Sequence, residues 1–325
     1  MSETKQPSGS GASAVPYPSP FKAWFIVGVL MLCYVFSFVD RQIISLLVGP
    51  IKRDLGLTDI QVGLLQGLAF AFLYTVLGIP IGRMADKLNR RNIIAAGVLI
   101  WSLAATYCGL AKNVFQLFLG RIGVGVGEAA LSPAAYSMMT DLFPREKQGS
   151  AFSIYNMGIT LGSALAYLIG GLVVVSVSGA GQMYTLPLFG EVRAWQMAFI
   201  VTGLPGILLP LLLFTFKDPA RRGLMTKINA AGETETVRPS VGETFAYAWQ
   251  SRSFYSKHFF AWALLAMVGY GAGAWLPEAV HRTYGIPTGE IGLMIGLGLL
   301  LVNTPAVFGF GKVSDFLLRK GKVRI

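Results

Sequence analysis

Eight long apolar runs constrain this chain more than any other feature of its sequence. Each is long enough to cross the hydrocarbon core of a bilayer, which takes about 20 apolar residues in a helix. Because the runs are continuously apolar and do not alternate with polar residues as barrel strands do, they predict helices. We therefore expect an all-α polytopic membrane protein. The predicted spans are Ala23–Val48, Ile60–Ile81, Ile93–Leu110, Val114–Met139, Ala151–Val177, Trp195–Phe216, Phe259–Pro277 and Ile291–Phe310.

The composition agrees with this class. Of the 325 residues, 54% are hydrophobic and only 13% are charged, whereas soluble domains usually carry about 25% charged residues. Two His and two Cys exclude a zinc-finger array and a disulfide scaffold. Residues 1–20 are rich in Pro, Ser and Gly, and they predict a disordered N-terminal tail.

The 27 Lys and Arg residues fall mainly in alternate loops. If the N-terminus is cytoplasmic, 20 of them lie on the cytoplasmic side and two lie within spans. The remaining five lie outside: Lys52, Arg53, Lys112, Arg193 and Arg282. This asymmetry follows the positive-inside rule. It explains the net charge of +11 by membrane orientation, so nucleic acid is not an expected partner. The predicted location is the cell membrane, either a bacterial inner membrane or a plasma membrane.

A polar stretch, residues 217–250, separates the first six spans from the last two. It predicts a cytoplasmic linker, possessing a surface helix, between two helical bundles. The first bundle is expected at 21–216 with six helices. The second is expected to start at 251–325 with two.

Two loops repeat one pattern. The segments from Gly82 to Arg91 and from Gly311 to Lys320 both read Gly-x-x-x-Asp-x-x-x-basic-basic, and each follows the second span of its half. A single copy is compatible with an ordinary basic turn. Two copies in equivalent places favour the internal duplication that is common in secondary transporters.

The chain resembles the major facilitator superfamily, whose signature loop matches Gly82, Asp86, Arg90 and Arg91. Within that superfamily it is most similar to Spinster-type lipid transporters, although organic-anion:cation symporters share two of the motifs. The likeness rests on Asp40-Arg41, on 86–91, on 121–130 and on 141–143. The resemblance implies a fold of twelve spans, of which this chain holds about eight. We therefore expect a truncated second bundle.

Four charged residues lie within predicted spans: Asp40, Arg41, Arg121 and Glu128. A charge at mid-bilayer costs at least about 2.5–3.5 kcal/mol, so each position needs a reason. Arg121 and Glu128 are seven residues apart and share a helix face, where Gly125 is expected to leave a gap in the wall. The resemblance implies that spans one and four line a central cavity, where Asp40, Arg121 and Glu128 would couple transport to protons. The alternative is a structural ion pair that only locks the two spans together.

Arg121 carries a planar cation suited to a phosphate or carboxylate, so Arg121 and Glu128 are also candidate substrate ligands. Aromatic residues in spans are often packing residues or interface anchors, which makes the other candidates weaker. These are Ser132, Tyr136, Asn156, Tyr270, Trp275 and Asn303.

Arg41 is a candidate gating residue, and the alternative role for it is packing. The other candidate gating residues are charged residues of the repeated loops. The loop residues are Asp86, Arg90, Arg91, Asp315 and Arg319. The resemblance implies that Asp86 pairs with an eleventh span. It also implies that Asp315 pairs with the start of the fifth span, near residues 148–151.

These features predict a proton-coupled secondary transporter that moves lysophospholipids or sphingoid-type amphipaths by alternating access. Two alternatives remain: a proton-coupled symporter of small organic anions, and a receptor or scaffold that keeps the fold without transport. An enzyme is not expected, because the Gly-x-Gly-x-Gly of span four lacks the preceding strand of a dinucleotide site. No cofactor or metal is expected. The expected partners are the cargo, protons and membrane lipids, and the expected state is a monomer.

Overall fold

The computed structural model describes residues 16–176, 183–187, 190–222, 226–228, 234–236 and 240–320. Most of the predicted tail at 1–20 therefore lies outside the described residues. All eight predicted spans are helices. In chain order they are α1 (Pro20–Gln42) continued by the 3-10 helix η1 (Ile43–Leu46); α3 (Asp59–Gln66) with α4 (Leu68–Lys87); α5 (Arg90–Cys108); α6 (Val114–Glu128) with α7 (Leu131–Leu142); α8 (Arg145–Ser176); α9 (Ala194–Gly206) with α10 (Leu209–Leu213); α12 (Arg252–Tyr284); and α13 (Thr288–Gly298) with the π-helical turn η2 (Leu299–Asn303) and α14 (Thr304–Arg319).

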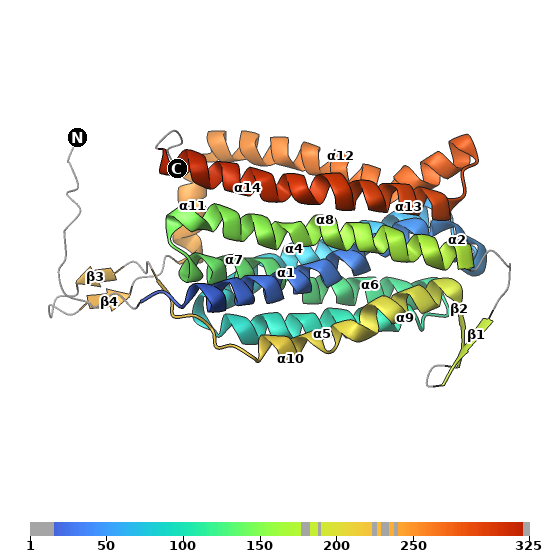
Figure 1. Ribbon diagram of the computed structural model, residues 1–325, viewed down its shortest axis with the longest axis horizontal. Coiled ribbons are helices and arrows are strands. Elements are labelled where there is room, and N and C mark those ends of the chain that lie inside the picture. Colours follow the sequence, from blue (N-terminus) through green and yellow to red (C-terminus); the bar gives the residue numbers. More distant parts are fainter. Residues whose placement is uncertain are drawn as a thin grey trace.

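The helices run along one long axis, and the start of α1 and the end of α14 lie at the same end (Figure 1). We call this the proximal end and the opposite end the distal end. The largest error in the predicted bounds is in the seventh span, which was expected over 259–277 but runs as α12 from Arg252 to Tyr284. Its polar flanks continue the helix beyond the apolar core, and Pro277 lies inside it.

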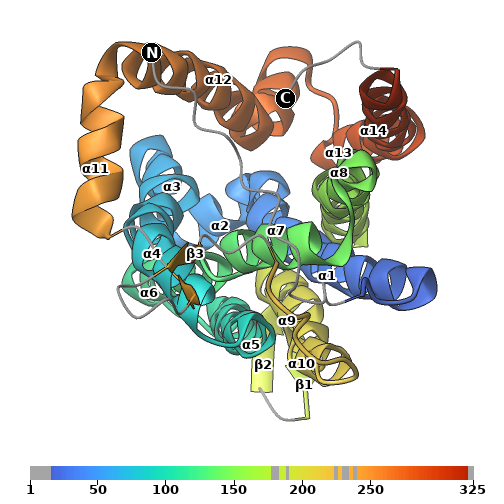
Figure 2. The same cartoon turned by 90° about the vertical axis from the view of Figure 1, so that its left-hand side faces the viewer.

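Short elements cap the two ends of the bundle. The helix α2 (Val48–Leu55) and the hairpin of β1 (Met183–Leu186) with β2 (Gly190–Arg193) lie at the distal end, where Met183 pairs with Arg193. The predicted linker at 217–250 contains the hairpin of β3 (Thr226–Ile228) with β4 (Thr234–Thr236) and the helix α11 (Val241–Gln250). Figures 1 and 2 together show α11 lying across the proximal end, so the expected surface helix is present.

Local signals set the ends of several helices. Thr58 accepts from the Gln61 main-chain N–H while the Gln61 side chain accepts from the Thr58 N–H, which forms a capping box at the start of α3. Asn89 accepts from the Asn92 N–H at the start of α5. Gly56 and Gly285 have φ of 65° and 69°. Only glycine adopts this conformation at little cost, so α2 and α12 end there.

The first six spans form one bundle, in which α1 packs along α8 and α5 packs between α6 and α9. Close approach depends on small residues. A side chain at Gly127 of α6 would meet the Trp101 nitrogen of α5 at 2.5 Å and the Gly97 oxygen at 2.6 Å. The helices α13 and α14 pack against α8, and the end view in Figure 2 shows α12 along the top of the molecule, between α11 and α13.

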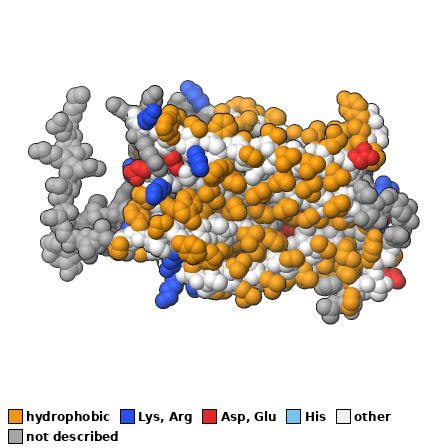
Figure 3. Space-filling model, in the orientation of Figure 1, with side chains coloured by type: hydrophobic (Ala, Val, Ile, Leu, Met, Phe, Trp, Pro, Cys, Tyr) orange, Lys and Arg blue, Asp and Glu red, His pale blue; other side chains and the backbone are white. Residues whose placement is uncertain are grey.

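Apolar side chains cover the middle of the face drawn in Figure 3, and charged side chains gather at its ends. Lys and Arg are concentrated at the proximal end of that face. The five basic residues expected outside belong to elements at the distal end: α2, the loop between α5 and α6, the end of β2, and the end of α12. This distribution agrees with a helical bundle that crosses a membrane along its long axis.

Candidate functional site

A buried ion pair lies between the first and fourth spans. The Arg41 Nη2 donates to Glu128 Oε2, and the Ser37 hydroxyl donates to the same oxygen at 2.7 Å. The Glu128 side chain is 1% exposed and that of Arg41 is 10% exposed. Since two charges are removed from water here, good geometry and further hydrogen bonds must offset the desolvation cost.

Aromatic rings surround the guanidinium of this pair. The Arg41 Cζ lies 4.7 Å from the ring centroid of Phe38, 4.4 Å from that of Phe70 and 5.3 Å from that of Tyr74. A ring face attracts a cation more strongly when water is excluded. The rings therefore hold the guanidinium in place and leave its charge available to one anionic partner.

A second pair of charges lies next to the first without a mutual side-chain contact. The Arg121 Nη1 donates to the main-chain oxygen of Asp40 at 3.1 Å. Both Asp40 carboxylate oxygens, and the Nε and Nη2 of Arg121, are buried without a hydrogen-bond partner among the described residues. The neighbouring Thr202 hydroxyl donates instead to the Ala198 main-chain oxygen at 3.0 Å. Buried polar atoms of this kind are costly and rare.

This geometry differs from the predicted one in two respects. Asp40, Arg121 and Glu128 were expected to meet in one cluster, but the cation that pairs with Glu128 is Arg41, whose long side chain reaches across from the last turn of α1. Gly125 was expected to leave a gap in the wall. A side chain there would collide with the main chain of Phe70, so Gly125 closes the wall and brings Phe70 up to the guanidinium.

Three of the predicted lining residues meet in a cluster on α7 and α8. The Ser132 hydroxyl lies 3.1 Å from that of Tyr155, and the Tyr136 hydroxyl donates to Asn156 Oδ1 at 2.9 Å. Tyr155 also stacks on Tyr34 of α1 with ring centroids 4.4 Å apart. We call these five residues the tyrosine cluster. It combines aromatic faces with hydroxyl and amide groups.

The other three lining candidates lie apart from this cluster. Tyr270 is 59% exposed on α12. Trp275 is half-buried against the distal part of the core, above Gly63 of α3. Asn303 is an exposed residue of the π-helical turn η2.

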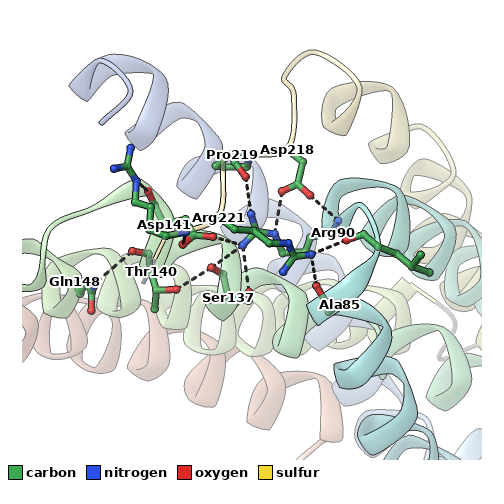
Figure 4. Close-up of polar contacts among 11 residues, drawn as sticks. Ala85, Arg90, Ser137, Thr140, Asp141, Gln148, Asp218, Pro219 and Arg221 are labelled. Atoms are coloured by element: carbon green, nitrogen blue, oxygen red, sulfur yellow. Dashed lines mark hydrogen bonds and ion pairs between the residues drawn. The ribbon is translucent and has the colours of Figure 1, made fainter. Parts of the chain in front are cut away.

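The repeated loops lie at the proximal end, and the first is built around Arg90 (Figure 4). Its guanidinium is fully buried. It donates to Asp141 at 2.5 Å, to Asp218 at 2.9 Å, and to the main-chain oxygens of Ser137 at 2.9 Å and Pro219 at 2.7 Å. Arg90 thus joins the loop after α4 to the end of α7 and to the segment that follows α10. We call Arg90, Asp141 and Asp218 the Arg90 cluster.

The remaining residues of the first loop are more exposed. Arg91 donates to the Phe216 main-chain oxygen at 2.9 Å. Arg221 donates to the loop carbonyls of Ala85 and Leu88 at 2.6 and 2.7 Å. Asp86 is exposed and lines a cavity of about 870 Å³ between α4 and α11.

The second loop contains the predicted contact of Asp315. The main-chain N–H of Ser150 donates to Asp315 Oδ2 at 3.0 Å, and the Ser150 hydroxyl donates to the same oxygen. This bond confirms the expected partner near residues 148–151 and ties α14 to α8. Arg319 ends α14, and its side chain lies outside the described residues.

Both the sequence and the fold have matches among known proteins. Residues 30–324 fit the sequence profile of the Major Facilitator Superfamily. The chain belongs to the Major Facilitator Superfamily. An MFS-type efflux pump of Mycolicibacterium smegmatis is 28% identical over 305 residues, which cover 93% of this chain and 64% of that protein. A probable L-galactonate transporter of Escherichia coli is 24% identical over 309 residues, which cover 91% of this chain and 62% of that protein.

Among solved structures, this superfamily member is similar to a bacterial homologue of the human lysosomal transporter Spinster in an inward-facing and unoccupied conformation. The two share 31% identity and a TM-score of 0.69 over 90% of this chain and 60% of that one. The predicted likeness to Spinster-type proteins is confirmed. The chain spans between 60% and 64% of the length of these three proteins. Family and fold are those of membrane transporters, not of enzymes.

Sequence reasoning missed several residues of the sites described above, among them Ser37, Tyr155 and Asp218. The place of Ser37 beside the ion pair could have been predicted, because Ser37 precedes Arg41 by four residues and therefore shares its helix face. Tyr155 directly precedes a predicted lining residue, but its face of α8 could not be assigned without the packing. Asp218 lies in the polar stretch after the sixth span, and its partner Arg90 is 128 residues away.

Proposed function

We propose that this chain is part of a proton-coupled secondary transporter that moves amphipathic lipids by alternating access. One observation carries the proposal. The ion pair of Arg41 with Glu128 is buried within the membrane-crossing body, next to an Asp40 whose carboxylate oxygens have no partner among the described residues. A charge left unpaired in such a place is costly, and a proton removes that cost. Asp40, which lacks a partner, and Glu128, which has one cation as partner, are two buried acids suited to carrying protons across the protein.

The geometry suggests how a proton would control the binding of cargo. When Glu128 takes up a proton, its charge is lost and its attraction for Arg41 falls. The guanidinium, held by Phe38 and Phe70, is then available to an anionic headgroup, since its planar fork matches a phosphate or carboxylate. When Glu128 releases the proton, it competes for Arg41 and displaces the headgroup. Arg121 holds the Asp40 main chain beside this site.

The tyrosine cluster supports a lipid as cargo. Its stacked and edge-on rings offer apolar surface to a hydrocarbon tail, while Ser132 and Asn156 offer hydrogen bonds near a headgroup. The sequence resemblance to Spinster-type lipid transporters supports the same class of cargo. Tyr270, Trp275 and Asn303 would add to this lining from the second half.

A small organic anion is the second candidate, and the ion pair itself favours it. A single guanidinium in a polar site also fits a sugar acid, and a relative is named as a probable L-galactonate transporter. Both candidates use the same proton step and differ only in the part of the cargo that lies beyond the anionic group.

We also propose that the proximal end is cytoplasmic, in agreement with its concentration of Lys and Arg (Figure 3). Asp86, Arg90, Arg91, Asp315 and Arg319 would then act on the cytoplasmic side in gating. The bundle boundaries at 21–216, 217–250 and 251–325 and a monomeric state belong to the same proposal.

Flux into proteoliposomes tests the cargo. The protein is reconstituted with an imposed proton gradient, and uptake of a lysophospholipid is compared with uptake of galactonate. The proposal expects proton-driven movement of the lipid alone. Galactonate uptake would establish the second candidate, and a protein that moves neither, while binding one of them, would indicate a receptor.

Replacing Asp40 with Asn is expected to abolish the pH dependence of transport while the protein still folds. Asn keeps the shape of the side chain, and no described hydrogen bond to the Asp40 carboxylate is lost. The measurement is the uptake rate between pH 5 and pH 8. Glu290→Gln is the matched control, because it removes an exposed acid from the first turn of α13. If Asp40→Asn keeps the parent's pH profile, Asp40 carries no proton.

A further inference from the structure

The contacts of α12 with the first bundle are concentrated in its distal half. The buried residues of this helix are Pro277 and Glu278. In its proximal half, Phe259, Phe260 and Trp262 are between 59% and 67% exposed. The helix therefore meets the first six spans near the distal end and diverges from them toward the proximal end.

Two contacts join α12 to the first bundle near the distal end, and the one that lies deeper in the protein depends on Pro277. In an α-helix the oxygen of Gly273 would accept from the N–H of residue 277, but Pro277 has no N–H. The freed oxygen accepts instead from Gln42 Nε2 at 3.0 Å and from the Tyr167 hydroxyl at 2.9 Å. Gln42 Nε2 also donates to the Tyr167 hydroxyl at 2.7 Å. Three spans, the first, fifth and seventh, thus meet at one carbonyl group.

The second contact between α12 and the first bundle is ionic and lies closer to the distal surface. Arg282, near the end of α12, donates to both carboxylate oxygens of Asp59 at 2.9 and 3.0 Å. Lys52 also pairs with Asp59, and Glu278 pairs with Arg282 at 2.8 Å. The Arg282 and Asp59 side chains are each 46% exposed. Water screens this layer, so it is weaker than its geometry suggests.

We propose that these two layers form a gate that holds the distal side of the transporter closed, and that Gln42, Tyr167 and the Gly273 carbonyl are its main lock. The proposal rests on the proposed alternating-access function. Gln42 is the last residue of α1 and directly follows Arg41. The lock and the central ion pair therefore share one helical turn, and movement of that turn during release of Arg41 would reach the lock without an intermediate element.

Distances between spin labels measure the state of this gate without any cargo. Labels are placed on cysteines at Lys112→Cys, between α5 and α6, and at Tyr284→Cys, at the end of α12. Both positions are exposed, and both belong to the distal elements described above. The native Cys33 and Cys108 are replaced with Ala. Double electron–electron resonance on the protein in lipid then gives the ratio of long to short distances.

Gln42→Ala is expected to raise this ratio by about three- to tenfold, because it removes two hydrogen bonds and leaves the freed carbonyl with one donor. Arg282→Gln is expected to raise it by at most about fivefold, and high salt should reproduce that smaller change in the parent protein. Tyr167→Phe removes the remaining donor by a conservative change and takes the place of Gln42→Ala if that variant does not fold.

Arg193→Gln is the matched control. Arg193 pairs with Asp54 at 2.9 Å on the same distal surface, but both residues belong to the first bundle. Unchanged distances in Gln42→Ala and Tyr167→Phe would overturn the gate, and so would an equal shift in Arg193→Gln. A shift in a protein that moves no lipid would refute the proposed cargo and leave the gate intact. Lipid transport without a shift would remove the gate alone.

Discussion

Replacing Glu128 with Gln is expected to abolish proton-driven uptake and its pH dependence. The substitution keeps the size of the side chain and an oxygen that can accept from Ser37, but it removes the charge that pairs with Arg41. A Gln side chain takes up no proton between pH 5 and pH 8. Protonation could therefore no longer switch Arg41 between residue 128 and the cargo. The measurement is uptake into proteoliposomes with and without a proton gradient.

Glu128→Gln is also expected to destabilise the protein, because the Arg41 guanidinium stays buried without its counter-charge. Breaking a buried pair by removing one partner typically costs about 3–5 kcal/mol. A paired substitution separates this effect from coupling. Arg41→Gln combined with Glu128→Gln removes both charges, so its thermal unfolding temperature in detergent should recover toward that of the parent. Its proton-driven uptake should stay absent.

The paired substitution also decides between a working site and a structural ion pair. If the pair only locks the first span to the fourth, the doubly substituted protein should regain transport together with stability. Recovery of proton-driven uptake in that protein would therefore contradict the proton-coupling role of Glu128.

The second large effect is expected from Arg90→Ala at the proximal end. Arg90 is fully buried and binds two carboxylates, Asp141 and Asp218, as well as two main-chain oxygens. Alanine would leave both carboxylates with an uncompensated charge in a largely buried place, at a cost of about 3–5 kcal/mol. We expect a marked fall in the thermal unfolding temperature and in the yield of folded protein.

Arg91→Ala is the control for this experiment, since the neighbouring residue has the same charge on the same loop. Arg91 donates to the Phe216 main-chain oxygen and to the side chain of its exposed neighbour Asn92, and it contacts the ring of Phe214, but it binds no carboxylate among the described residues. Its loss should cost about 1 kcal/mol or less. Equal effects of the two substitutions would show that the Arg90 cluster does not hold the loop after α4 to α7 and to the segment that follows α10.

The Arg90 cluster and the charges within the spans differ in how completely they are paired. The Arg90 cluster has its carboxylates matched by donors on several elements, which suits a permanent joint. In the central site, by contrast, Glu128 Oε1, the Asp40 carboxylate and part of Arg121 lack partners among the described residues. Incomplete pairing of this kind leaves room for a proton or a ligand to change the arrangement.

The positions of the spans and of the buried charges could be predicted from the sequence alone. Membrane helices are specified by local hydrophobicity, because every backbone polar group must be satisfied within its own segment. Since charges are costly inside such apolar segments, Asp40, Arg41, Arg121 and Glu128 are exceptional by their place in the sequence. The repeat also predicted the contact of Asp315, which meets Ser150 as expected, whereas the pairing of Asp86 with an eleventh span stays a prediction.

Only the tertiary structure decided which of these groups meet. Arg41, not Arg121, reaches Glu128, since the choice depends on how closely α4 and α6 approach at Gly125 and on the rings that this approach brings around the guanidinium. Pro277 is visible in the sequence, but the donors that occupy the oxygen it frees come from α1 and α8, 231 and 106 residues from Gly273. Partner choice between distant helices is set by packing, and no local pattern of residues encodes it.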